Sequence, residues 1–349
     1  MMPTAEHVRQ ATALVHAALA YRDCEPWTVI AERECFALRD PVSHEQIFVS
    51  VRGHAGGWAG LALFRGSEGI QSMSMLMYAP LESLDEREVL DISGTFVELR
   101  PMCLLPERAN APLEAAGVRI PSNELAPDFM TYLPGYVPGG PTVEEIRLLT
   151  LALQQAAAVT LDVVDDIVRL GPTDRNWIER RLVRGETTRW EYVAVGQDVV
   201  PSPHRLSGDP VDELTRARLS RLPRHFHEIW AIDLVPISMV LELSDRERWP
   251  IVVALLIVDR ESGRTVHSEL LPAPARYDGI GGVLARAFVT VGARPGQLRV
   301  RDYRLRARIA PVARALECKL ISMRYLPALD EAHVALRAAL NPPRGPAAG

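Results

Sequence analysis

A run of eight apolar residues at 251–258 (IVVALLIV) constrains the fold more than any other segment. The run is too short to cross a bilayer, which takes about 20 residues in a helix. A continuous apolar run of this length, ended by a turn, is typical of a strand buried on both faces of a sheet. Such a strand requires helices on the sheet, so we expect an α/β (α+β) fold.

The elements around this run predict a mixed sheet of β-β-α-β-α-β-α order in the C-terminal part. The two antiparallel strands come first, and right-handed crossovers then place helices on the faces of the sheet. The expected elements are strand 251–258, turn 259–263, strand 264–271, helix 280–291, strand 297–302, helix 306–317, strand 319–324 and helix 329–340. A strand is also expected at 229–237, with a break at Pro236.

The N-terminal part shows a comparable alternation of strands and helices. Glycines in the segment 53–57 (GHAGG) predict a hairpin, since glycine supplies the positive φ of such turns. Thr142 and Glu145 form a capping box that predicts a helix to about residue 158. The remaining elements expected here are helix 4–20, strands 28–38, 46–52, 58–64 and 95–99, and helices 67–78 and 106–116.

Turn formers and lapses of periodicity predict two domains. A chain of 349 residues has room for about two domains of ordinary size. Proline and glycine cluster at Pro201-Ser202-Pro203 and Ser207-Gly208-Asp209-Pro210. We therefore expect an N-terminal α/β domain over 1–160, a connecting segment over 161–224, a C-terminal domain over 225–341 and a disordered tail over 342–349.

Composition excludes several classes of protein. With 48% hydrophobic and 24% charged residues the chain is globular rather than disordered or fibrous. Its four cysteines form no C-x-x-C pair, which argues against a zinc ribbon and suits a reducing compartment. The beginning of the chain lacks the pattern of a signal peptide. A cytoplasmic protein without a membrane partner is expected.

The net charge of −5 is unevenly distributed. From Asp245 onward the chain has 17 basic and 10 acidic residues, whereas the rest has 22 basic and 34 acidic residues. A basic part joined to an acidic part indicates either an anionic partner or two domains that attract each other. Nucleic acid is the less favoured partner, because the chain lacks lysine-rich tracts and a basic isoelectric point.

Several segments resemble an uncharacterised bacterial two-domain family of unknown function. In the N-terminal part these are FALRDP (36–41), IFVSVRG (47–53) and LPGYVP (133–138). In the C-terminal part they are IWAIDLVP (229–236) and RPGQLRVRD (294–302). The resemblance implies a pairing of two domains and no particular reaction.

The C-terminal part also resembles the ribonuclease-H-like fold of integrases and transposases. IVDRESG (257–263) is similar to the strand and hairpin in which that family carries a catalytic aspartate. The resemblance implies Asp259 as the first acid and Asp302 as the second. The third acid has no clear counterpart, and Asp330 and Glu331 are the candidates for it. Tyr303 departs from the small or amide residue usual after the second acid, and the third acid comes early.

Asp259 and Asp302 end their predicted strands, where α/β sheets commonly bind ligands. Two neighbouring carboxylates repel unless a cation bridges them, so Mg²⁺ would be their natural metal. Two metal ions could activate water and stabilise the leaving oxygen of a phosphodiester. The alternative is that Asp259 begins a hairpin turn and Asp302 pairs with neighbouring arginines.

Two further patterns stay open. Arg299 and Arg301 alternate with Leu298, Val300 and Asp302, so the arginines lie on the opposite face of their strand from Asp302. Guanidinium groups suit phosphate, although a solvated or interdomain face is the simpler interpretation. His225 and His227 share a face as metal ligands would, but the sequence offers no third ligand for them.

The chain contains no complete catalytic constellation, and the most enzyme-like one has no clear third member. We therefore expect a non-enzymatic binding or regulatory protein without a cofactor, with an unknown protein partner or self-association. The alternative is a Mg²⁺-dependent nuclease or strand-transfer enzyme with Asp259 and Asp302 as metal ligands and Asp330 or Glu331 completing the catalytic site.

Overall fold

The computed structural model describes residues 5–79, 81–171, 176–184, 187–196, 207–240 and 248–340. The chain divides into two compact units, which are Met1–Leu133 with Pro138–Pro203, and Pro134–Val137 with His204–Gly349. Each unit contains a mixed sheet and helices, as the predicted α/β class requires.

The first unit is built on a seven-stranded sheet in the order β5-β4-β3-β2-β1-β6-β7. Neighbouring strands are antiparallel except β1 and β6, which are parallel. The strands are β1 (Phe36–Arg39), β2 (Gln46–Arg52), β3 (Ala59–Arg65), β4 (Gly94–Pro101), β5 (Leu125–Tyr132), β6 (Asn176–Arg184) and β7 (Thr188–Gly196). The helices are α1 (Ala5–Cys24), α2 (Gly66–Leu76), α3 (Glu86–Val89), α4 (Asn110–Ala115) and α5 (Val143–Val164).

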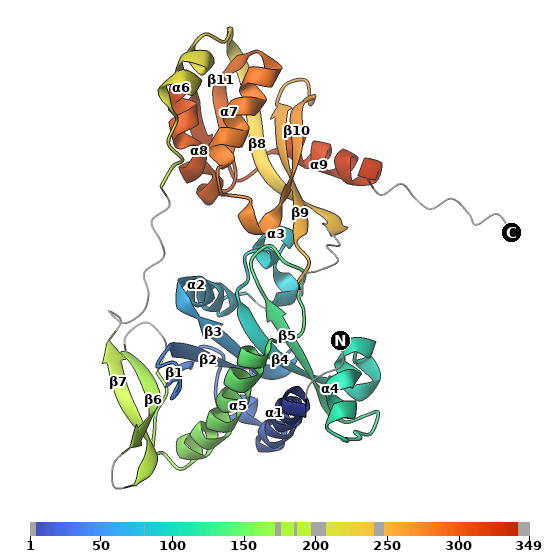
Figure 1. Cartoon of the computed structure of the whole chain (residues 1–349), viewed down its shortest axis with the longest axis vertical. Coiled ribbons are helices and arrows are strands. Elements are labelled where there is room, and N and C mark those ends of the chain that lie inside the picture. Colours follow the sequence, from blue (N-terminus) through green and yellow to red (C-terminus); the bar gives the residue numbers. More distant parts are fainter. Residues whose placement is uncertain are drawn as a thin grey trace, which may run out of the picture. The chain divides into compact units, whose positions relative to one another are not determined.

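Helices cover both faces of this sheet. The long helices α1 and α5 lie side by side (Figure 1), and their apolar residues share one core with β1, β2 and β3. The opposite face packs against α2 through Ile70, Met73 and Leu76. The predicted capping box is confirmed: Thr142 and Glu145 each accept a hydrogen bond from the other's backbone N–H at the start of α5.

The predicted glycine hairpin joins β2 to β3. Gly53 has φ +110°, and a Cβ added there would lie 2.7 Å from the Cα of Ala59. A larger residue would therefore be strained by its own backbone and would also clash with the facing strand. Glycine at this position lets the two strands pair directly after the turn.

Two strands of the first sheet, β5 and β6, were not predicted from the sequence. β5 contains Pro127 and Asp128, which disfavour a central strand, but it is the edge strand and needs no N–H at the proline. β6 contains four charged residues, of which Glu179 is fully buried. This carboxylate forms ion pairs with Arg39 and Arg181 and accepts a hydrogen bond from Gln46. Because the buried charge is paired in this way, a charged segment can occupy the sheet.

The second unit is built on a five-stranded sheet in the order β10-β9-β8-β11-β12. β9 is antiparallel to both β8 and β10, whereas β11 is parallel to both β8 and β12. The strands are β8 (Arg224–Val240), β9 (Ile251–Asp259), β10 (Thr265–Pro272), β11 (Arg294–Val300) and β12 (Lys319–Ser322). The helices are α6 (Glu213–Ser220), α7 (Ile280–Val291), α8 (Tyr303–Ala315) and α9 (Pro327–Leu340).

β9 is the buried strand that the apolar run predicts. One of its faces packs against α9, in a cluster that includes Leu256, Val258 and Leu329. The neighbouring strand β8 turns Trp230 to the opposite side, where its ring stacks on Phe288 of α7 at 5.7 Å. α7 and α8 lie side by side in this unit (Figure 1). The sheet is therefore covered on both faces.

The structure differs from the sequence prediction at several boundaries. β8 pairs with β9 in the second sheet, so three antiparallel strands precede α7, whereas the predicted β-β-α-β-α-β-α order has two strands before its first helix. The predicted connecting segment 161–224 contains β6, β7 and α6. The predicted strand 28–38 is regular only over β1. Pro201-Ser202-Pro203 and the predicted tail at 342–349 lie outside the described residues.

The LPGYVP segment supplies a short piece of the second unit. Within that unit the N–H of Val137 donates to Trp249 at 2.9 Å, and the N–H of Ile251 donates to Gly135 at 2.9 Å. Gly135 has φ +80°, and an added Cβ would lie 2.4 Å from the nitrogen of Pro274. A close approach of backbone therefore requires glycine here.

α5 is the helix that, within the described part of the chain, is long and apolar enough to cross a membrane by length and composition. Half of its most apolar window is buried inside the first unit. Leu149, Leu153 and Ala156 of this helix are fully buried in the core. The apolar face of α5 is therefore part of the core of the first unit.

Candidate functional site

Asp259, the expected first acid, caps the turn that follows β9. Its carboxylate accepts the backbone N–H groups of Glu261 at 2.8 Å and of Ser262 at 3.0 Å. Its carbonyl accepts the N–H of Gly263 at 3.0 Å. This is the Asp-initiated hairpin turn that the sequence left open as the alternative to a metal ligand.

Asp302, the expected second acid, is the N-cap of α8. One carboxylate oxygen accepts the N–H of Arg304 at 2.7 Å, and the other accepts the hydroxyl of Tyr277. A carboxylate in this place satisfies a free N–H and is stabilised by the positive end of the helix dipole. Asp302 therefore has a structural role at the start of the helix.

Strand direction also separates these two carboxylates. β9 is antiparallel to β8, and Asp259 lies opposite Trp230. β11 is parallel to β8, and Val300 lies opposite Ile232, two residues before Asp302. Because antiparallel strands run to opposite edges of a sheet, the carboxyl ends of β9 and β11 point in opposite directions.

The third acid of the predicted catalytic set lies on α9. Asp330 forms an ion pair with Arg301 at 2.7 Å, and Glu331 is exposed to solvent. Within the described ranges, no three or more His, Cys, Asp or Glu side chains gather in a group that could hold a metal ion. The structure therefore does not bring Asp259, Asp302 and Glu331 together.

The two histidines of β8 have different surroundings. His225 Nδ1 lies 2.8 Å from a carboxylate oxygen of Glu228. His227 lines a cavity of about 330 Å³ together with Ile229, Arg260 and Glu261. This cavity adjoins a second one because Arg260 lines both.

The second cavity, of about 220 Å³, lies between the sheet and the start of α9. Arg260 and Arg299 supply its charge. Arg299 lies opposite Ala231, which packs against α9, so the arginine points to that side of the sheet. The other residues of this cavity are Ala231, Met323, Tyr325, Leu326, Pro327, Ala328 and Leu329. We call it the arginine cavity.

The two arginines lack a carboxylate partner in the described part of the chain. Arg299 donates to the side chain of Gln297 at 2.9 Å. Burial and the neighbouring charge of Arg260 both lower the pKa of Arg299 below its usual value. The charge of Arg260 therefore disfavours the cation of Arg299, and an anion bound between the two would relieve that repulsion.

Of the two arginines of the arginine cavity, the sequence pattern singled out Arg299 and not Arg260. The alternation in β11 placed Arg299 on the face opposite Leu298 and Val300, which are fully buried. Arg260, which directly follows β9, was not singled out, because only the sheet order brings β9 and β11 to either side of β8. Two arginines that end up close together on separate strands leave no local signal in the sequence.

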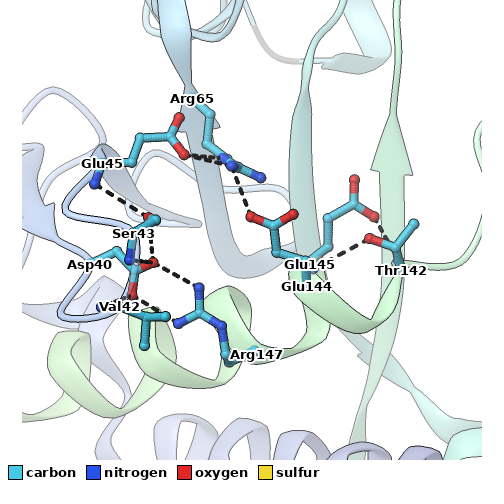
Figure 2. A network of polar contacts seen from close by, with 9 residues as sticks. All are labelled: Asp40, Val42, Ser43, Glu45, Arg65, Thr142, Glu144, Glu145 and Arg147. Atoms are coloured by element: carbon cyan, nitrogen blue, oxygen red, sulfur yellow. Dashed lines mark hydrogen bonds and ion pairs between the residues drawn. The ribbon is translucent and has the colours of Figure 1, made fainter.

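A second cluster of charges lies in the first unit, around the start of α5 (Figure 2). Arg147 donates to both carboxylate oxygens of Asp40, at 2.8 and 2.7 Å. Asp40 is fully buried and also accepts the N–H groups of Val42 and Ser43. Hydrogen bonds from Arg147 first, and from Ser43, hold the pKa of Asp40 well below its usual range.

Arg65 extends this cluster to the end of β3. It lies between two carboxylates, bonding Glu45 at 2.5 Å and Glu144 of α5 at 3.1 Å (Figure 2). These bonds raise the pKa of Arg65. Each charge in Figure 2 is thus matched by an opposite charge or a hydrogen bond, so the network ties α5 and the β1–β2 turn to the sheet.

Two domain families match the chain, one mainly over the first unit and the other within the second unit. Residues 12–180 match a domain of unknown function (DUF7309), and residues 215–337 match another domain of unknown function (DUF6930). No curated protein and no solved structure matches the chain. These matches assign no activity. The chain combines two domains of unknown function, DUF7309 followed by DUF6930, as expected for an uncharacterised two-domain family.

Proposed function

We propose that this chain is a non-enzymatic binding protein whose second unit holds an acidic segment of a protein partner at the arginine cavity. The observation that carries the proposal is the pair Arg260 and Arg299, which lie close together without a carboxylate partner among the described residues. We infer recognition rather than catalysis, because the described lining of the cavity places no carboxylate, histidine or cysteine beside the two arginines.

Electrostatics favours an anionic partner. Residues 204–349 carry 22 basic and 16 acidic residues, so the second unit attracts anions at long range as well as at the cavity. A guanidinium also binds carboxylates through two parallel hydrogen bonds, which fixes their orientation. Aspartate or glutamate side chains of a partner would pair with both arginines.

The wall of the arginine cavity favours a protein as that partner. Tyr325 exposes 73% of its surface beside the cavity, and Met323 lies next to it. Arginine, tyrosine and methionine are enriched at protein–protein interfaces, where tyrosine and arginine supply much of the binding energy. An acidic segment with one apolar side chain would match both the charge and the apolar wall.

The proposal also includes a ribonuclease-H-like second domain and a bacterial, cytosolic setting, both of which the sequence predicts. Three antiparallel strands, two α–β units and a final helix support a ribonuclease-H-like second domain. The scattered free cysteines support a reducing, cytosolic setting. The segments that resemble an uncharacterised bacterial family support a bacterial source. A metal-dependent phosphodiesterase is not proposed, because Asp259 and Asp302 both bond backbone N–H groups.

Affinity capture from lysate with quantitative mass spectrometry tests this function. The wild type is compared with Arg299→Glu and with Arg286→Glu, which makes the same charge change on an exposed residue of α7. We expect the wild type and Arg286→Glu to retain the same acidic proteins, and Arg299→Glu to lose them. Raising the salt concentration should weaken capture as well, because exposed charges are screened.

Identical capture by all three proteins would refute the arginine cavity as the binding site. A purified wild type that captures no protein but turns over a substrate would refute the non-enzymatic function. Circular dichroism of Arg299→Glu is the control for folding.

A further inference from the structure

A third cavity, in the first unit, carries an inference independent of the arginine cavity. It has a volume of about 390 Å³, which is within the range of small-molecule sites. It lies beside the hairpin between β2 and β3, and Gly56 and Gly57 form part of its rim. No residue of this cavity belongs to the network in Figure 2.

The floor of this cavity is a gap in a row of side chains across the sheet. Arg52 of β2 lies opposite Gly60 of β3, and Gly60 lies opposite Glu98 of β4. A Cβ on Gly60 would lie 2.1 Å from the carbonyl oxygen of Val97, so glycine is required by the close approach of β4. The row therefore has no side chain between Arg52 of β2 and Glu98 of β4.

Two charged groups of this cavity have no charged partner among the described residues. Arg52 donates from Nη1 to the carbonyl of Leu76 at 3.1 Å, and no carboxylate pairs with it. Glu32 accepts the N–H of Gly53 at 3.1 Å through one oxygen, and no basic group pairs with it. Both groups line the same cavity without forming an ion pair with each other.

The remaining wall is apolar. Phe96 and Leu76 belong to a buried cluster, and Leu81 packs against it. Glu98 is already paired with Arg100, which lies over the ring of Trp58 at 5.1 Å. The charges left for a ligand are therefore one cation and one anion beside an apolar surface.

We propose that this cavity binds a free α-amino acid with an apolar side chain. The carboxylate of the ligand pairs with Arg52 and its ammonium group pairs with Glu32, so each unpaired charge gains a partner. The apolar side chain lies against Phe96, Leu76 and Leu81. A ligand with only one charge leaves Arg52 or Glu32 unpaired, which makes both charges necessary for tight binding.

Isothermal titration calorimetry of the full chain tests this site. The probes are L-leucine and L-phenylalanine, with isoamylamine and isocaproate as leucine analogues that lack the carboxylate and the ammonium group. We expect the wild type to bind at least one amino acid, and each analogue to bind at least about tenfold more weakly. Arg52→Gln and Glu32→Gln should each weaken amino-acid binding by a similar factor.

Arg119→Gln and Glu114→Gln are the matched controls, because they change exposed charges of the same unit away from the cavity and should leave binding unchanged. The site is refuted if the wild type binds neither amino acid at about 10 mM, or if isocaproate or isoamylamine binds as tightly as leucine. These comparisons on the wild type remain decisive even if a variant fails to fold.

Discussion

Replacing Asp40 by asparagine removes a buried charge from the network around α5 (Figure 2). Asp40 is fully buried and bonds Arg147 through both carboxylate oxygens, whereas the side chain of Arg147 is 34% exposed. Asparagine has a single acceptor oxygen, and its amide group would face the donors of Arg147. Loss of one partner of a fully buried ion pair costs about 3–5 kcal/mol. Because Arg147 reaches water, we expect a smaller cost than for a fully buried pair, about 2–3 kcal/mol.

Thermal unfolding followed by circular dichroism measures this effect. For a unit of this size, 2–3 kcal/mol corresponds to a fall in Tm of about 5–10 °C for the transition of the first unit. Asp166→Asn is the control, because its ion pair with Arg169 is exposed on both sides and such pairs contribute little. A fall in Tm no larger than that of Asp166→Asn would refute this account of the network.

The same carboxylate predicts a dependence on pH. The folded pKa of Asp40 is lowered, chiefly by hydrogen bonds from Arg147, so the stabilisation is complete above the unfolded value of about 3.9. The stabilisation is lost as the pH falls below that value towards the folded pKa. The difference in Tm between wild type and Asp40→Asn should therefore shrink in acid below about pH 4.

Three further substitutions test separate parts of the fold by the same thermal measurement. Asp302→Ala removes the N-cap of α8 and should cost about 1–2 kcal/mol; an unchanged Tm would contradict its structural role. Thr142→Ala removes the cap of α5 and should cost about 1 kcal/mol, whereas Thr142→Ser should cost less than half of that. Gly53→Ala adds a Cβ 2.7 Å from Ala59 at a positive φ and should cost about 1–3 kcal/mol; a stabilised protein would contradict the hairpin geometry.

Local patterns were enough to predict many of the elements. The apolar run predicted β9, the capping box predicted the start of α5, and helical periodicity predicted α7 at Ile280–Val291. In each of these segments, residues close together in the sequence are enough to show which type of element forms. β5 and β6 were missed because their charged or proline residues are compensated by distant partners. Arg108, for example, bonds the buried Asp128 of β5 at 2.9 Å.

The candidate sites depend on sheet order, which the sequence pattern did not reveal. Asp259 ends β9 and Asp302 lies two residues after the end of β11, but these two strands run in opposite directions beside β8. The opposite directions of β9 and β11 place the carboxylates of Asp259 and Asp302 towards opposite edges of the sheet. Arg260 and Arg299 are brought to one cavity by the same arrangement.

Site-specific photo-crosslinking tests the arginine cavity as a binding site most directly. A photoreactive p-benzoylphenylalanine in place of Tyr325 lies beside Arg260 and Arg299, and the same residue in place of Val289, an exposed position on α7, serves as the control. We predict a crosslinked acidic protein from the first position, its loss when Arg299→Glu is added, and none from the second. Equal crosslinking at both positions, or crosslinking that survives Arg299→Glu, would contradict the proposed binding site.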